Sequence, residues 1–229
     1  MTTLSEIPEA ERRDPYVLSP EEAAELLAGH PWSRVVMMGD SIAKGIGDPS
    51  EGYANLTVFD RVAAALAASR PDLTYVNLGE RGLKAFEVRD SQLARALELR
   101  PDLAGVIAGP NDMFVEVFDV EPVKAVLEGI VTTLQEAGAT VMTFEIIDLP
   151  GCFGEPFAEV DRRLKLLHEA VREISAEHGT IHVDAYTQPW SRDRDCMSAD
   201  YQHATMRGQA LAASETIRVL GEYVRENGR

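Results

Sequence analysis

The fold is decided by the stretch Arg34-Val-Val-Met-Met-Gly-Asp-Ser41, an apolar run that ends in a small polar turn. Its apolar residues are consecutive and do not alternate with polar ones, which is typical of a strand buried on both faces. Parallel sheets bury their strands in this way, because the helices that connect the strands cover both faces of the sheet. The stretch therefore predicts a strand at 34–38 inside an α/β sheet, with a polar turn at the carboxyl end of that strand.

Strand-like and helix-like stretches alternate along the rest of the chain. Short apolar runs predict further strands at 73–78, 103–108, 140–147 and 180–184. Amphipathic stretches predict helices at 20–29, 53–69, 87–100, 120–137, 156–178 and 205–227. This alternation predicts one three-layer α/β domain over 1–229, with a leader and a short helix in 1–30 and the core in 34–226.

The composition argues against several classes of partner. Of the 229 residues, 38 are Asp or Glu and 22 are Lys or Arg, so the net charge is −16. We expect no binding to nucleic acid, because the chain has no concentrated basic patch that would offset repulsion of the phosphates. We also expect no membrane span, because no apolar run approaches the roughly 18–20 residues that a bilayer requires. The acidic residues are spread along the predicted helices, which is typical of a solvated surface.

The N-terminal residues and the cysteines indicate a compartment. Residues 1–14 contain no positively charged segment followed by an apolar run, so we expect no export signal and a cytoplasmic protein. The thiols of Cys152 and Cys196 are then expected to be reduced, and the sequence leaves a pair between them open. The sequence predicts no particular oligomeric state.

Four short polar segments lie where a parallel sheet binds its ligands, beyond the carboxyl ends of the strands. They occupy 39–41, 79–82, 109–112 and 200–203. Together they contain a serine hydroxyl, glycines that can expose backbone N–H groups, a side-chain amide, and a carboxylate shortly before an imidazole. Acyl transfer needs these groups as a nucleophile, a base that titrates near neutral pH, and donors for an oxyanion.

Taken in order, the four segments resemble those of the GDSL/SGNH hydrolase family, and the resemblance covers 35–212. It implies a flavodoxin-like α/β/α fold, in which the five predicted strands form one parallel sheet. The chain has no GxGxxG after the first strand and no GxxxxGK(S/T), so we expect no cofactor. The implied activity is hydrolysis of a carboxylic ester or thioester through an acyl-enzyme, so the implied partner is a small-molecule ester.

The resemblance also implies a role for five residues. Ser41 is the nucleophile, His203 is the general base and acid, and Asp200 fixes the tautomer of that histidine. The backbone N–H of Gly82 and the side-chain amide of Asn111 bind the oxyanion. The chain departs from the family pattern after the histidine, where Ala204 stands in place of the usual proline, and in the first segment, which reads Gly-Asp-Ser-Ile instead of Gly-Asp-Ser-Leu.

Several alternatives stay open at this point. The same acyl-enzyme would serve an acyltransferase, and a flavodoxin-like binding module without activity is a third possibility. Gly79 competes with Gly82 as the backbone donor, and Asp184 at the end of the last predicted strand competes with Asp200. Asp40 and Asp112 are expected to hold turns.

The remaining candidates concern metals and the walls of the site. We expect no metal site, because the histidines do not recur at the spacing of metal ligands. The segment 148–157, which contains Phe153 and Phe157, is a candidate wall of the acyl pocket. Further candidates are Met113, Phe114 and Phe118 as a second wall, and Lys44 and Arg81 as cations that attract an anionic substrate.

Overall fold

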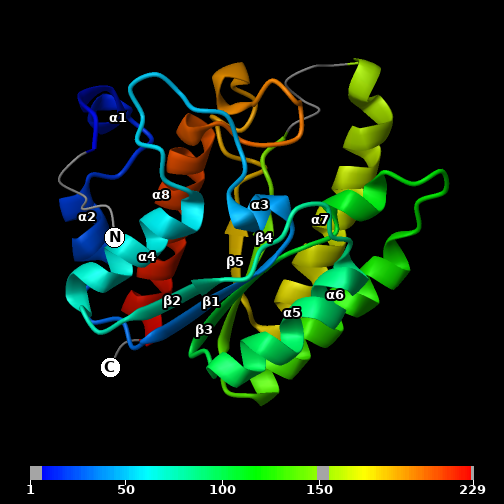
Figure 1. The fold of residues 1–229 in the computed structure, drawn as a ribbon, viewed down its shortest axis with the longest axis horizontal. Coiled ribbons are helices and arrows are strands. Elements are labelled where there is room, and N and C mark those ends of the chain that lie inside the picture. Colours follow the sequence, from blue (N-terminus) through cyan, green and yellow to red (C-terminus); the bar gives the residue numbers. More distant parts are fainter. Residues whose placement is uncertain (1–6, 149–154, 228–229) are drawn as a thin grey trace.

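The computed structural model describes residues 7–148 and 155–227. Its centre is a five-stranded parallel sheet in the order β2-β1-β3-β4-β5, which confirms the predicted sheet (Figure 1). The strands are β1 (Arg34–Gly39), β2 (Thr74–Asn77), β3 (Leu103–Ile107), β4 (Thr140–Glu145) and β5 (Ile181–Asp184). The strand order reverses between β1 and β3, and ligands bind at such a reversal in open α/β sheets.

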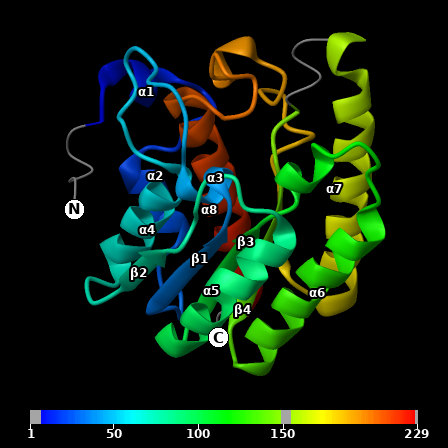
Figure 2. The same cartoon turned by 45° about the vertical axis from the view of Figure 1, so that its right-hand side comes forward.

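Helices cover both faces of the sheet and complete the three predicted layers, as Figures 1 and 2 show from two directions. On one face α8 packs against α2, α4 and β5, and on the other α6 packs against α5 and α7. The longer helices are α4 (Val58–Ser69), α5 (Ala85–Leu99), α6 (Val120–Glu136), α7 (Ala158–His178) and α8 (Met206–Asn227). Shorter helices are α1 (Glu9–Arg13), α2 (Pro20–Leu26) and α3 (Ser41–Lys44).

The helix predicted at 53–69 begins later than expected, at Val58. Thr57 ends the preceding loop, because its hydroxyl accepts a hydrogen bond from the backbone N–H of Asp60 and the Asp60 carboxylate accepts one from the N–H of Thr57. This reciprocal cap fixes the first turn of the helix. The unpredicted helix α1 is held in the fold by Glu11, which is fully buried in an ion pair with Arg61.

The end of β1 is shaped by close packing around Gly39. A Cβ atom at this position would lie 1.9 Å from the backbone oxygen of Ile107, so no other residue fits without moving β3. The buried Gln92 of α5 holds the same residue, because its amide accepts from the Gly39 N–H at 2.8 Å and donates to the Gly39 carbonyl at 2.9 Å. The end of β1 that leads into the turn is therefore packed against β3 and hydrogen-bonded to α5.

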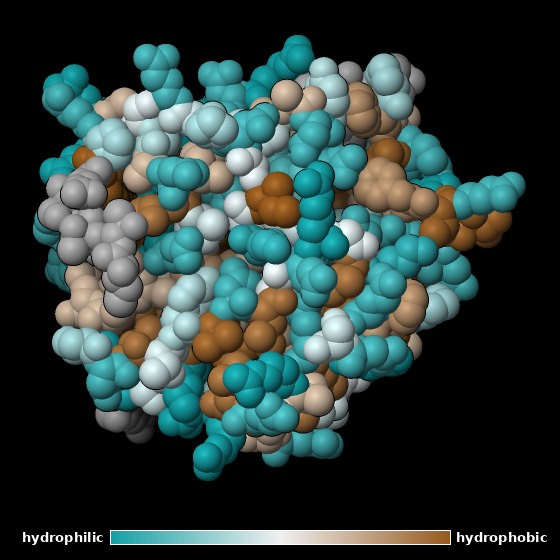
Figure 3. Space-filling model, in the orientation of Figure 1, coloured by the Kyte–Doolittle hydropathy of each residue, from teal (hydrophilic) through white to brown (hydrophobic). Residues whose placement is uncertain are grey.

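The surface agrees with the acidic composition. In Figure 3 hydrophilic side chains cover most of the visible face, and the hydrophobic patches between them are separate from one another. Within 7–148 and 155–227, we find no helix with the length and apolar character that crossing a membrane demands.

Candidate active site

Three polar side chains meet at the carboxyl edge of the sheet. The Oγ atom of Ser41, at the start of α3, lies 2.7 Å from Nε2 of His203, and Nδ1 of that imidazole lies 2.6 Å from Oδ2 of Asp200. Ser41 and His203 are almost fully buried, whereas the Asp200 side chain is 40 % exposed. The folded chain thus joins a hydroxyl, an imidazole and a carboxylate in a line, across 162 positions of sequence.

The loop that carries the last two residues is held from within. Asp200 Oδ1 accepts hydrogen bonds from the backbone N–H groups of Gln202 at 3.0 Å and His203 at 3.1 Å. The base of the loop is closed by an antiparallel bridge between Met197 and Ala204. This bridge fixes the residue after the histidine without the proline that is usual there.

The hydrogen bonds at Asp200 also set its ionisation. Partial burial on its own would raise the pKa of Asp200, but hydrogen bonds from the His203 ring and from the backbone outweigh it and hold the pKa below its usual value. The carboxylate is therefore ionised near neutral pH and accepts a proton-bearing Nδ1. The lone pair of His203 Nε2 is then directed at the hydroxyl of Ser41.

Asp40 and Asn111 form a second hydrogen-bonded pair next to the serine. Asp40 Oδ1 accepts from the backbone N–H of Ile42 at 2.9 Å and caps α3, and Oδ2 accepts from Nδ2 of Asn111 at 3.2 Å. The same Nδ2 donates to the backbone oxygen of Leu83 at 3.0 Å. The amide has only two protons, so both are engaged in the resting site.

Burial gives Asp40 an unusual ionisation. The carboxyl group is fully buried, and its burial, with a further contribution from the charge of Asp112, raises the pKa of Asp40 to about 7. In the folded protein this group therefore keeps its proton at pH values where an unfolded chain has lost it.

This raised pKa predicts a loss of stability as the pH rises. The folded state holds the extra proton between about pH 4 and pH 7, so the free energy of unfolding falls across that window and stays lower above it. The shift from 3.8 to about 7 corresponds to about 4 kcal/mol. Asp40→Asn is expected to flatten this slope in chemical denaturation at pH 5 and pH 8.

The matched control for this measurement is Asp72→Asn, which changes an exposed carboxyl group. It is expected to keep the slope of the wild type. If the free energy of unfolding of Asp40→Asn fell as steeply with pH as that of the wild type, another group would have to cause the pH dependence.

Gly79 and Gly82, the two candidates for the backbone N–H donor to the oxyanion, differ in their surroundings. The N–H of Gly79 donates to Oδ1 of Asn77 at 2.9 Å, and a Cβ there would lie 2.5 Å from the backbone nitrogen of Lys44. Gly79 is thus packed under α3 with its donor occupied. Gly82 has a φ of +82° and open space around it, and it precedes Leu83, whose carbonyl accepts from Asn111. This geometry favours Gly82.

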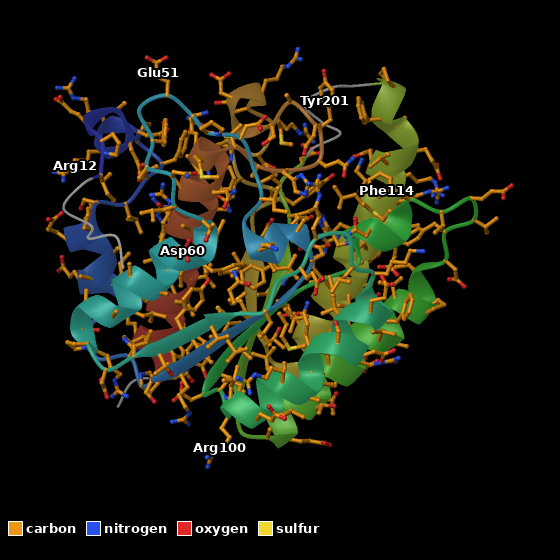
Figure 4. The ribbon with its side chains drawn as sticks, in the orientation of Figure 1. Arg12, Glu51, Asp60, Arg100, Phe114 and Tyr201 are labelled. Carbon is orange, nitrogen blue, oxygen red and sulfur yellow. The ribbon has the colours of Figure 1, made fainter. Side chains whose placement is uncertain are left out.

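A pocket with an empty volume of about 520 Å³, its open mouth included, lies over the serine. Phe157 lines it together with Met113 and Phe114, whereas Phe118 packs against the core with Arg163 over its ring. Figure 4 labels Phe114 and Tyr201, the exposed aromatic residues of this pocket, at the same end of the molecule as α3.

The other candidate residues lie in turns, on the surface, or outside the described residues. Asp184 caps the turn after β5 by accepting from the N–H groups of Tyr186 and Thr187, so it does not orient the imidazole. Asp112 accepts from the N–H of Ala85 at the start of α5. Two expectations fall on residues 149–154, outside the described residues: Phe153 as a wall, and Cys152 as a partner of Cys196. The side chains of Lys44 and Arg81 are exposed, and they do not line the pocket over the serine.

Among the described residues, one group could offer three ligand atoms to a metal ion. Glu128, in the middle of α6, and Glu177 and His178, at the C-terminal end of α7, bring these atoms within 4.8 Å of one another. Nε2 of His178 already lies 2.9 Å from the Glu128 carboxylate. The group is a surface ion pair away from the serine, and nothing in its geometry links it to the site.

Comparison with known proteins identifies the family. Residues 37–211 match the model of the GDSL-like Lipase/Acylhydrolase family, whereas no curated protein matches the chain in sequence. The match covers most of the chain and includes both the strand edge and the loop before α8. The chain belongs to the GDSL-like lipase/acylhydrolase family, and it is an ester hydrolase of that type.

Solved structures with low sequence identity share the fold. The lipase/acylhydrolase from Enterococcus faecalis has a TM-score of 0.65 at 21% identity, with 83% of this chain and 96% of that chain covered. An acetyl xylan esterase from Geobacillus stearothermophilus has a TM-score of 0.67 at 18% identity, with 85% and 97% covered. For the psychrotrophic esterase EstA from a Pseudoalteromonas species, the TM-score is 0.65 at 18% identity, with 84% and 99% covered.

Proposed function

We propose that this protein hydrolyses carboxylic esters through an acyl-enzyme formed on Ser41. One observation carries the proposal: the imidazole of His203 contacts the serine hydroxyl at 2.7 Å and the carboxylate of Asp200 at 2.6 Å. A buried hydroxyl becomes a nucleophile when a base in hydrogen-bond contact removes its proton. The imidazole is such a base, and its orientation is fixed on the opposite side by the carboxylate.

The reaction proceeds in two halves. Ser41 Oγ attacks the acyl carbon while His203 Nε2 takes the hydroxyl proton, and the imidazolium then gives that proton to the leaving alcohol. In the second half, water attacks the acyl carbon while the same imidazole takes a proton from it. The bond between the acyl carbon and Ser41 Oγ then breaks, the imidazolium returns the proton to Oγ, and the free acid leaves. Asp200 stays ionised throughout and stabilises the imidazolium.

The negative oxygen of each tetrahedral intermediate needs donors. The backbone N–H groups of Ser41 and Gly82 and the side-chain amide of Asn111 are the proposed set. The resting bond between Asn111 and Asp40, at 3.2 Å, is the longer of the two that the amide makes, so it is the one that the oxyanion replaces.

Labelling with a fluorophosphonate tests the nucleophile. The folded wild-type protein is expected to gain one phosphonyl group, and peptide mapping is expected to find it on Ser41. The control is the same protein unfolded in denaturant, which should remain unlabelled. Absence of labelling in the folded protein, or labelling at another residue, would contradict the proposal.

Removal of the amide tests the oxyanion hole. Asn111→Ala is expected to lower kcat/KM for p-nitrophenyl acetate by about 10²–10³, because it removes one donor to the oxyanion. The control is Asn55→Ala at an exposed loop position, which should leave the rate unchanged. An Asn111→Ala enzyme with the wild-type rate would exclude this residue from the hole.

The acyl-enzyme is also the intermediate of an acyltransferase. Product analysis in the presence of alcohols and amines distinguishes the two reactions. Free acid is the product that our proposal expects, and an ester or amide formed faster than free acid would favour transfer.

A further inference from the structure

A second cavity lies beside the catalytic pocket, on the side of the sheet that α4 and α8 cover. Its empty volume is about 640 Å³, its open mouth included. Three residues line both the cavity and the pocket over the serine: Ile42, Ile146 and Gln202. Ile42 follows the serine in the chain and Gln202 precedes the histidine, so the two spaces adjoin next to the catalytic pair.

The walls of this cavity are mainly apolar. The sheet contributes Phe144 and Val183, the start of α4 contributes Phe59, and Ala212 lies on the face of α8 that points to the sheet. Figure 2 shows α4 and α8 on the same face of the sheet, and they are in contact with each other. The cavity therefore lies between the sheet and the layer that α4 and α8 form, with an opening to the outside.

Two of the polar lining residues, both on α8, have hydrogen-bond partners within the fold. Gln209 accepts from the N–H of Val58 at 3.2 Å and donates to the carbonyl of Gly45 at 3.0 Å. The hydroxyl of Thr216 donates to the backbone oxygen of Ala212 at 2.8 Å.

Glu145 is the charged residue of the lining, and it too has its partners. Its two oxygens lie 2.9 Å from Nε2 of His182 and 2.7 Å from Nη1 of Arg172. The exposed Gln202 lies where the cavity meets the pocket over the serine, and the rest of the polar lining is paired. A mainly apolar cavity whose inner polar groups are paired holds water poorly and suits an apolar guest.

We propose that this cavity receives the acyl chain of the ester while its carbonyl carbon is bound at Ser41. The inference rests on the proposed function and adds its substrate class, esters of medium-length unbranched fatty acids. The lining runs along α8 from Gln209 to Thr216, two turns or about 10 Å. The leaving alcohol then occupies the outer pocket, whose rim carries the exposed Phe114 and Tyr201.

A series of p-nitrophenyl esters tests the inference in the wild type. Burial of a methylene is worth about fourfold in binding, from roughly 0.8 kcal/mol per group. We therefore expect kcat/KM to rise from acetate through butyrate and hexanoate to octanoate, and to fall again for palmitate. A profile that is highest at acetate would overturn the inference.

A variant that fills the cavity provides the sharper test. Ala212→Leu adds three carbons to the lining and should lower the ratio of kcat/KM for octanoate over acetate by at least tenfold. The matched control is Ala94→Leu, the same change at an exposed position of α5, which should keep the ratio of the wild type. If the leucine variant does not fold, Ala212→Val makes the smaller change and should lower the ratio in the same direction.

The outcomes separate this inference from the proposed function. If the fluorophosphonate does not label Ser41, the proposed function fails and the acyl cavity fails with it. If it labels Ser41 and the leucine variant keeps the wild-type ratio, the acyl cavity alone is wrong.

Discussion

Ser41→Ala is expected to lower kcat for a p-nitrophenyl ester by about 10⁶, the largest effect that we anticipate for any single change in this protein. The reason is that the proposed acyl-enzyme cannot form without Oγ, the atom that His203 contacts at 2.7 Å. Steady-state kinetics with the ester at saturation measures the effect, and thermal unfolding shows whether the variant keeps its fold.

Ser175→Ala is the control for this change. Ser175 is also buried, but its hydroxyl bonds to Thr180 in the turn between α7 and β5. Its removal should leave kcat near the wild-type value. If Ser41→Ala retained a substantial fraction of the wild-type rate, another residue would have to be the nucleophile.

Asp200→Asn is expected to lower kcat by about 10⁴. The Asn side chain can present an N–H to Nδ1 of His203, and the imidazole proton then moves to Nε2. That nitrogen would face the hydroxyl of Ser41 as a donor and could not accept its proton. Kinetics at pH 8 checks this expectation.

The alternative carboxylate supplies the control. Asp184→Asn alters the other aspartate considered for this role, and an asparagine oxygen can still accept from the N–H groups of Tyr186 and Thr187. Its rate should stay close to that of the wild type. Since Asp200 acts through the serine, adding Asp200→Asn to Ser41→Ala should cost no further activity. An Asp184→Asn enzyme that lost as much as Asp200→Asn would contradict the assignment.

Much of the fold could be predicted from the sequence, because the strands are short apolar runs and the helices between them are amphipathic. The run at 34–38 is β1, and the runs predicted at 103–108 and 140–147 contain β3 and β4. For predicting the site, the four polar segments together were more informative than any single residue. Their order and their position at strand ends carried the family resemblance, which implied the five site residues, and the structure joins three of these by hydrogen bonds.

What could not be predicted depends on contacts between distant positions. The amide of Gln92, in the middle of an amphipathic helix, gives no sign that it will hold the end of β1. The bond from Asn111 to Asp40 spans 71 positions, and no spacing rule connects them. The cavity next to the serine is a volume that side chains leave empty, which depends on how all the layers pack. The helix α1 lies in a segment that reads as a polar leader, and its buried ion pair between Glu11 and Arg61 joins positions 50 residues apart.

The link between Asp40 and Asn111 has a further consequence for the proposed reaction. Because one amide proton is already bound by Asp40, the oxyanion does not gain a new hydrogen bond from Asn111 but takes over an existing one. The stabilisation that it receives is the difference between two acceptors. With a pKa of about 7, Asp40 is present as both a strong anionic competitor and a weaker neutral one near neutral pH. In the proposed reaction, the strength of the hydrogen bond that the oxyanion displaces therefore depends on the proton of Asp40, a residue outside the triad.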